Sequence, residues 1–137
     1  MLKLVLDTNT LVSAFFWEGN ESKLFEKIEE GKILLFTSLE ILKEAEEVLK
    51  RPKFKEVIMS TKQTPNEIIQ KIISISHIVF GPKLNINICR DPNDNMFIEC
   101  AINAKADYIV SGDKDLLTLK EYANVKIVTT SEMLRLL

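Results

Sequence analysis

The chain has 137 residues, of which 46% are hydrophobic and 28% are charged, and its formal net charge is -2. These values predict one soluble domain with a single apolar core and exclude a disordered or fibrous protein. No apolar run approaches the ~20 residues of a membrane span, and the N-terminus lacks the pattern of a secretion signal, so we expect a cytoplasmic protein. The slightly acidic balance argues against binding of nucleic acid through bulk positive charge.

Short apolar segments alternate with helical patterns along the chain, which is typical of a parallel sheet covered by helices. The expected strands are 2–6, 33–36, 77–80, 108–110 and 125–128. The expected helices are 11–16, 21–31, 39–50, 52–59, 64–76, 96–104 and 131–137. Because crossovers between parallel strands are right-handed, the predicted fold is α/β, a three-layer α/β/α sandwich with a parallel five-stranded sheet in one domain, 1–137.

The two cysteines and the single histidine are interpreted as structural residues. Cys100 lies in a helical apolar pattern, and no second pair accompanies Cys89 and Cys100 to form a zinc site. We therefore expect free thiols in a reducing compartment. His77 begins an expected strand, far in sequence from the polar motifs described next.

The first expected strand ends abruptly at Asp7, within the acidic turn Asp-Thr-Asn. In open α/β sheets, ligands bind beyond the carboxyl ends of the strands, so Asp7 is a candidate for chemistry. The alternative is that Asp7 only caps the following helix. Asn9 is either a plain N-cap residue or a support whose amide holds Asp7 or a bound water.

A second acidic turn precedes the helix 96–104. Asp91 can cap that helix, Pro92 can be its first residue, and Asp94 can act as a capping-box partner. Against this structural role, helical periodicity places Asp94 within about 60° of the buried stripe, so its side chain should lean toward the sheet. Glu99 points the other way and is expected to be a solvated surface residue.

A third acidic turn follows the fourth expected strand. Asp113 stands at its carboxyl end, and the small residues Ser111 and Gly112 would let a ligand approach. Asp115 either shares this task or caps the short turn 116–117.

The helix 39–50 carries four glutamates, most of which must form an ordinary charged face. Only Glu44 and Glu46 lie on the shoulders of its apolar stripe, each about 100° from the centre. Periodicity does not choose between these two.

Four motifs now stand in order: Asp-Thr-Asn after a first strand, Ser38 followed by Glu44 in a helix, Arg-Asp-Pro-Asn-Asp-Asn before an apolar helix, and Tyr-Ile-Val-Ser-Gly-Asp-Lys-Asp-Leu-Leu. Together they closely resemble PIN-domain proteins, and in particular small VapC-type toxin ribonucleases, over essentially the whole chain. The resemblance implies an acidic catalytic and metal-binding quartet of Asp7, Glu44, Asp94 and Asp113. It also implies supporting roles for Asn9, Ser111 and Asp115.

The chemistry of such a cluster follows from its residue types. Carboxylates gathered at one sheet edge repel one another and take up protons unless a divalent cation neutralises them. Oxygen ligands without His or Cys favour Mg²⁺ or Mn²⁺ over zinc. The prediction is a metal-dependent endoribonuclease that hydrolyses RNA phosphodiester bonds. Candidate phosphate contacts are Arg51, Lys53, Lys55, Lys83, Arg90 and Lys114.

Partners follow from the resemblance and from one apolar run. The resemblance implies the toxin of a toxin-antitoxin pair, with a cognate antitoxin protein. Phe15, Phe16 and Trp17 exceed what one small domain needs to bury at that place, so we expect a symmetric homodimer, as similar PIN proteins commonly form.

Two other functions compete with this prediction. The first is a phosphatase or phosphotransfer enzyme on a Rossmann-like fold with Asp7 as nucleophile. The haloacid-dehalogenase phosphatases require a second Asp two residues later, and that position is Asn9 here. The second is a non-catalytic PIN-fold binding protein.

Overall fold

The computed structural model describes residues 1–16 and 19–137 and has a mostly parallel sheet at its centre. Within the described residues the sheet has six strands in the order β3-β2-β1-β4-β6-β5. Their bounds are β1 Lys3–Leu6, β2 Leu34–Thr37, β3 Ser76–Ile78, β4 Tyr108–Val110, β5 Glu121–Tyr122 and β6 Val125–Val128. The observed strands begin and end within about two residues of those expected, which is the normal uncertainty of such boundaries.

The expectation of five strands was wrong by one. β5 is a two-residue strand that pairs antiparallel with β6, whereas all other pairings are parallel. Ala123 and Asn124 join β5 to β6 with φ values of 50° and 68°, the left-handed values that a two-residue type I′ hairpin requires. A strand of two residues is too short to produce a detectable alternation of apolar and polar side chains.

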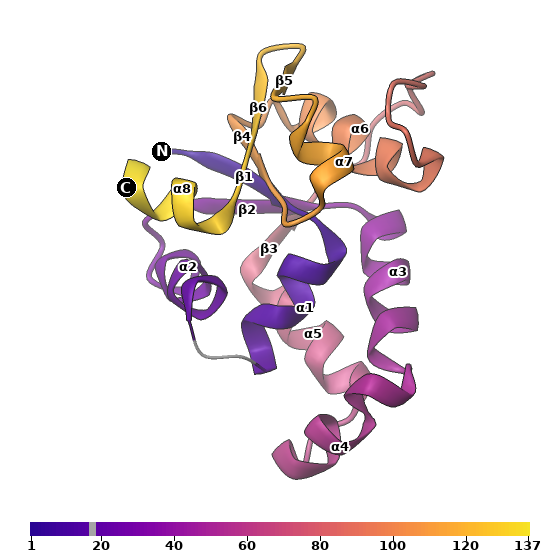
Figure 1. Ribbon diagram of the computed structural model, residues 1–137. Coiled ribbons are helices and arrows are strands. Elements are labelled where there is room, and N and C mark those ends of the chain that lie inside the picture. Colours follow the sequence, from indigo (N-terminus) through magenta and orange to yellow (C-terminus); the bar gives the residue numbers. More distant parts are fainter. Residues whose placement is uncertain (17–18) are drawn as a thin grey trace.

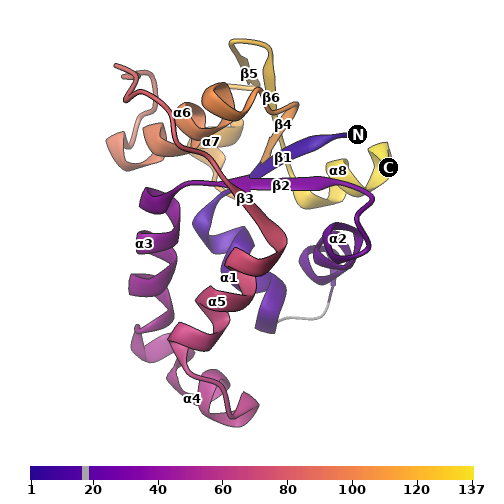
Figure 2. The same ribbon diagram turned by 180° about the vertical axis from the view of Figure 1, so that it is seen from behind.

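Helices cover both faces of this sheet. Their bounds are α1 Thr8–Phe16, α2 Asn20–Glu29, α3 Leu39–Leu49, α4 Pro52–Thr61, α5 Pro65–Ile75, α6 Asn95–Ala104, α7 Lys114–Leu117 and α8 Thr130–Leu136, with a 3-10 turn η1 at Pro92–Asp94. Figures 1 and 2 show α1, α3 and α5 on one face and α6 on the other. The predicted α/β/α arrangement is therefore confirmed, and α4 lies at the end of α3 that is remote from the sheet (Figure 1).

The two central strands are apolar on both faces. Leu4 and Val5 of β1, and Ile109 and Val110 of β4, are completely buried. A strand covered by helices on both sides reads as a continuous apolar run, which is why the first and fourth strands were visible in the sequence. Burial of this kind fixes the register in which Leu6 lies opposite Val110.

The strand order places the candidate site. The chain leaves β1 toward β2 and β3 on one side, then returns to β4 on the other side of β1. The chain therefore adds strands on one side of β1 and then on the other, so the strand order reverses between the parallel strands β1 and β4. At such a point open α/β sheets bind ligands beyond the carboxyl ends of their strands. Asp7 follows β1 and Asp113 follows β4 by a few residues, so the two acidic turns meet at this edge.

The aromatic run at the end of α1 is used within the chain. Phe15 packs edge-on against Phe25 with ring centroids 4.7 Å apart, and Phe16 lies 5.7 Å from Phe54. Both are half-buried against the core and have aromatic neighbours within the chain, so the homodimer expected from this apolar run stays a prediction. Trp17 lies outside the described residues. Among the helices that are described, none is long and apolar enough to cross a membrane.

Candidate active site

Asp7 is a buried carboxylate at the carboxyl end of β1. Its side chain is only 5% exposed. Its backbone N–H continues the ladder to β4 by donating to the carbonyl of Val110 at 3.1 Å. Its Oδ1 accepts the N–H of Thr10 at 2.8 Å in the first turn of α1. Asp7 therefore does cap α1, as one interpretation held, but this bond uses a single carboxylate oxygen.

The other oxygen of Asp7 is held from β4. Ser111, whose side chain is fully buried, donates its hydroxyl hydrogen to Asp7 Oδ2. The same hydroxyl accepts the backbone N–H of Asp113 at 2.9 Å. One hydroxyl thus joins the acidic turn after β1 to the acidic turn after β4. Ser111 therefore contacts Asp7 and the turn of Asp113 directly, and its supporting role in catalysis stays a prediction.

Asp94 comes close to both turns from a third part of the chain. The pKa of Asp94 is raised from 3.8 to about 7, first because the carboxyl group is buried and then because it faces the carboxyl group of Asp113, with further repulsion from Asp91 and Asp7. Its Oδ2 is buried and has no hydrogen-bond partner among the described residues. Asp91 caps η1 by accepting the N–H of Asn93 at 3.0 Å, so the capping role belongs to Asp91 and leaves Asp94 free to lean inward.

A hollow of about 360 Å³ opens beside Asp7 and Asp113. It is lined by Asp7, Asn9, Thr10, Ser13, Glu21, Gly112 and Asp113. Glu21, a half-buried acid in the first turn of α2, was not identified from the sequence. The signal that could have drawn attention to this face is the polar set Asn9, Thr10 and Ser13, which shares one side of an otherwise apolar helix.

The structure distinguishes the two glutamates of α3 that periodicity left open. Glu46 is exposed and pairs with Lys50 at 3.0 Å, one turn later in the same helix. Glu44 is half-buried, and its side chain makes no hydrogen bond or ion pair with another described residue. Glu44 does not line the hollow beside Asp7, so the structure brings together three members of the implied quartet and leaves Glu44 outside their contacts.

The remaining supporting residues have different surroundings. Asp115 is half-buried and lies 3.7 Å from the guanidinium of Arg90. Its backbone N–H donates to Asp113 at 3.1 Å, so Asp113 is the residue that caps α7. Asn9 is exposed and lines the hollow, but the bonds that hold Asp7 come from Thr10 and Ser111 and not from the Asn9 amide.

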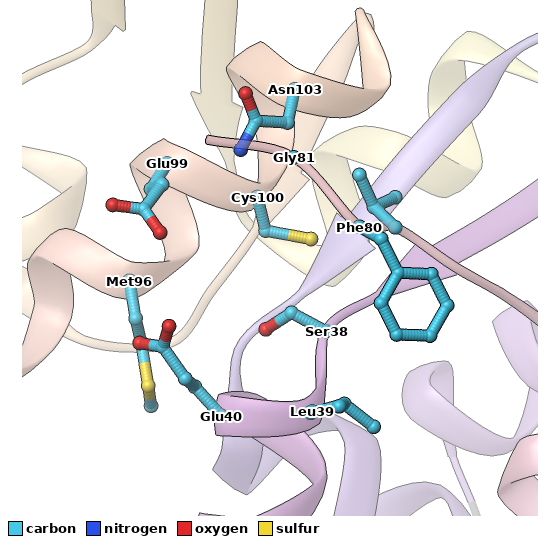
Figure 3. Close-up of a pocket in the computed structure, with 10 residues that line it drawn as sticks. Ser38, Leu39, Glu40, Phe80, Gly81, Met96, Glu99, Cys100 and Asn103 are labelled. Carbon is cyan, nitrogen blue, oxygen red and sulfur yellow. The ribbon is translucent and has the colours of Figure 1, made fainter. Parts of the chain in front are cut away.

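The expectation that Glu99 is a solvated surface residue was wrong. Glu99 is half-buried, and its Oε2 accepts the backbone N–H of Leu84 at 3.0 Å. The segment that follows β3 folds back over α6. Its sequence has no periodic pattern from which this position could be predicted. Figure 3 shows Glu99 with Glu40, Cys100 and Asn103 around a second hollow of about 180 Å³.

The cysteines and His77 have the structural surroundings that were expected. Cys89 and Cys100 are free thiols. Burial, followed by nearby carboxylates, raises the pKa of Cys89 to about 11, and burial raises the pKa of Cys100 to about 12. Both thiols therefore stay protonated and unreactive near neutral pH. The ring of His77 stacks on Phe36 with centroids 5.1 Å apart.

The acids at the sheet edge fit a hard divalent cation in their chemistry. Their ligand atoms are carboxylate oxygens, and the unpartnered Asp94 Oδ2 is a buried acceptor that a cation would satisfy. Within residues 1–16 and 19–137, no three His, Cys, Asp or Glu side chains are gathered closely enough to hold an ion in common. Asp7, Asp94 and Asp113 are therefore neighbours whose side chains do not form a closed coordination shell.

Comparison with known proteins identifies the family. A family model described as PIN domain matches residues 3–115. An uncharacterized protein of Methanocaldococcus jannaschii is 36% identical over 123 residues, which cover 88% of this chain and 76% of that protein. The chain belongs to the PIN-domain family. Because PIN domains are typically metal-dependent nucleases, this membership supports a nuclease, and hence a hydrolase.

The raised pKa of Asp94 has a consequence for stability in metal-free buffer. An aspartate with an ordinary pKa in the unfolded chain loses its proton near pH 3.8, whereas folded Asp94 keeps it until about pH 7. Between these values the folded state binds more protons, so Asp94 should lower the free energy of unfolding as the pH rises through this window, with no further change above it. Urea unfolding across this range measures the slope.

The matched variants are Asp94→Asn, which should remove this contribution, and Asp113→Asn, which should weaken it because the facing carboxylate is gone. The free energy of unfolding should therefore fall less steeply with pH in Asp94→Asn than in the wild type. A steeper fall in Asp94→Asn would contradict the proximity of these acids.

Proposed function

We propose that the protein is a metal-dependent endoribonuclease that hydrolyses RNA phosphodiester bonds with Mg²⁺ or Mn²⁺. The observation that carries this proposal is that Asp94 interacts electrostatically with Asp113 and Asp7, so that carboxylates from three separate parts of the chain are neighbours where the strand order reverses. Burial, and then the facing carboxyl group of Asp113, raise the pKa of Asp94 to about 7. Such an arrangement costs stability, and proteins retain costly clusters of this kind mainly at functional sites.

Each residue has a task in this proposal. Asp7, Asp94 and Asp113 would hold the cation, and Glu44 would complete the set through the resemblance to the family. The cation would neutralise charge on the scissile phosphate and activate a water, so that hydrolysis needs no protein nucleophile. Ser111 orients Asp7 and the turn of Asp113. Lys114 is exposed beside Asp113 and can contact a phosphate of the substrate.

Single-stranded or looped RNA is the substrate form that suits this site. Asp7 and Asp113 line a hollow at the sheet edge, and Asp7 is almost fully buried. A scissile phosphate reaches such a recess when its neighbouring bases are splayed apart, which a stacked duplex resists.

The competing phosphatase has weaker support. The haloacid-dehalogenase phosphatases require a second Asp two residues after the nucleophile, and the residue two positions after Asp7 is Asn9. The family to which the chain belongs also favours phosphodiester cleavage.

The cellular role in the proposal is that of a toxin with a cognate antitoxin, acting in the cytoplasm. This part rests on the resemblance to small VapC-type proteins. The homodimer is proposed on the same ground, since Phe15 and Phe16 pack within the chain.

The catalytic proposal predicts the effect of neutral replacements. Asp7→Asn and Asp94→Asn should each lower cleavage of labelled single-stranded RNA by about 100-fold or more, because the site loses a charged oxygen that the metal and phosphate require. Glu44→Gln should also lower cleavage. The matched control is Glu46→Gln. Glu46 lies on a different face of α3 from Glu44 and pairs with Lys50, so this variant should keep full activity.

The assay compares Mg²⁺, Mn²⁺ and EDTA, with folding of each variant checked by thermal unfolding. Cleavage that persists in EDTA, or that survives Asp7→Asn, would rule out the proposed mechanism. Hydrolysis of phosphate monoesters without cleavage of RNA would favour the phosphatase.

The toxin proposal makes a separate prediction in cells. Expression of the chain alone should arrest growth, because an unneutralised ribonuclease depletes RNA, whereas the Asp113→Asn form should be tolerated at the same protein level. Growth curves with matched immunoblots measure this. Equal growth of both strains would contradict the toxin role without bearing on cleavage in vitro.

A further inference from the structure

An acidic site on an acidic chain needs a separate surface to bind RNA. Asp7, Asp94 and Asp113 repel the phosphates that flank the scissile bond, and the net charge of -2 offers no general attraction. Phosphate contacts by Lys and Arg supply most of the affinity of nonspecific nucleic-acid binding. A cationic surface that adjoins the active-site hollow would therefore carry the strand.

Such a surface lies between α2 and α8, which are side by side in both ribbon views (Figures 1 and 2). A hollow of about 460 Å³ runs between these helices, and we call it the α2–α8 groove. Its lining residues are Asn20, Lys23, Glu26, Lys27, Ser131, Leu134 and Arg135. A neighbouring hollow shares Lys27 and Leu134 and adds Lys32, so the cationic surface continues past the groove.

The cations of this groove are available to a ligand. Lys23, Lys27 and Arg135 take part in none of the ion pairs of the described residues. Glu26 is the one acid in the lining, and Lys32 nearby is paired with Glu30 at 2.9 Å. Lys23 and Lys27 stand one turn apart on the same side of α2, about 6 Å along its axis. The groove thus presents three cations that have no ion-pair partner within the described residues, together with Glu26 and the apolar Leu134, and the charge of Lys27 also acts on Glu30.

The groove and the active-site hollow share no lining residue, but they adjoin at the first turn of α2. Glu21 lines the hollow that contains Asp7 and Asp113, and the preceding residue, Asn20, lines the α2–α8 groove. A chain that leaves the active-site hollow past the first turn of α2 therefore enters the groove directly.

The hollow between α3 and α6 is acidic, in contrast to the α2–α8 groove. The hollow in Figure 3 is lined by two carboxylates, Glu40 and Glu99, which point into it from α3 and α6. The next hollow along α6 shares both acids and adds Lys83 as its cation. The cations of α4, Arg51, Lys53 and Lys55, lie at the far end of α3 (Figure 1). Charge therefore directs a phosphate backbone toward α2 and α8.

We propose that the α2–α8 groove is the binding track for the sugar-phosphate backbone of a single-stranded RNA, next to the cleavage site. This inference rests on the proposed function and extends it, because it names the surface that holds the strand outside the reacting centre. Lys23, Lys27 and Arg135 contact phosphates of nucleotides beyond the scissile bond. The bases face away from the groove, so binding there does not depend on sequence.

The test reverses two charges and varies the length of the substrate. Lys23→Glu with Lys27→Glu should raise KM for a strand about 12 nucleotides long by about tenfold or more at about 0.1 M salt. The slope of log KM against log salt should fall by about 1.4, which corresponds to two lost phosphate contacts on a single strand. The value of kcat should stay unchanged, because neither lysine touches the reacting phosphate. A di- or trinucleotide, which reaches only the active-site hollow, should be cleaved as by the wild type.

The matched control is Lys43→Glu with Lys105→Glu, two exposed lysines that line none of the hollows described above. It changes the net charge by the same amount and should leave KM and the salt slope unaltered. Both pairs of lysines are near or at the surface, so thermal unfolding of the variants should match the wild type. An equal rise of KM in the control pair, an equal loss on short and long RNA, or an unchanged salt slope would overturn the groove assignment.

A binding assay separates this inference from the proposed function. Fluorescence anisotropy with labelled single-stranded RNA reports binding even for a chain that cleaves nothing, and the Lys23→Glu, Lys27→Glu form should bind more weakly. Failure of the wild type to cleave RNA would refute the proposed function and leave this measurement intact. Tight binding of poly-glutamate that RNA does not displace would overturn the RNA track and identify the groove as a site for an acidic protein.

Discussion

The hydroxyl of Ser111 is the interaction on which the site depends. It is buried between the ends of β1 and β4, where it donates to Asp7 and accepts the N–H of Asp113. It can make both bonds only while Leu6 stays opposite Val110. A slip of one residue would also turn the apolar side chains of both strands to the wrong faces, so burial of the central sheet fixes this register. The core therefore keeps the carboxylates close against their own repulsion.

The molecule separates two electrostatic tasks that one surface could not perform. Chemistry on a phosphodiester needs carboxylates that hold a cation, whereas binding of the strand needs cations that face phosphates. The acids gather at the carboxyl ends of β1 and β4, and unpaired cations line the groove between α2 and α8. The first turn of α2 carries both Glu21 and Asn20, so the two surfaces adjoin. In the proposed function, this local arrangement would let a chain with a small negative net charge bind RNA.

Residues whose role depends on a regular element could be predicted from the sequence. Asp7 and Asp113 follow apolar strands, and helical periodicity places Asp94 near the buried side of the helix that follows it. Residues whose role depends on an irregular segment could not be predicted. Glu21 lines the hollow because the first turn of α2 lies beside α1, and Glu99 is covered because the segment after β3 folds over α6. β5 is too short to show a period. Glu46 could be set apart from Glu44 only once its pair with Lys50 was seen.

The central claim is that Asp7, Asp94 and Asp113 form a cation site beyond the carboxyl ends of β1 and β4. Paramagnetic Mn²⁺ gives the most direct test of this claim. In amide spectra of the full chain, substoichiometric Mn²⁺ should broaden the signals of Thr10, Ser111 and Gly112 first. The signals of residues around the hollow of Glu40 and Glu99 should stay sharp. The broadening should disappear in Asp7→Asn. Broadening centred on Glu40 and Glu99, or unchanged broadening in Asp7→Asn, would contradict the claim.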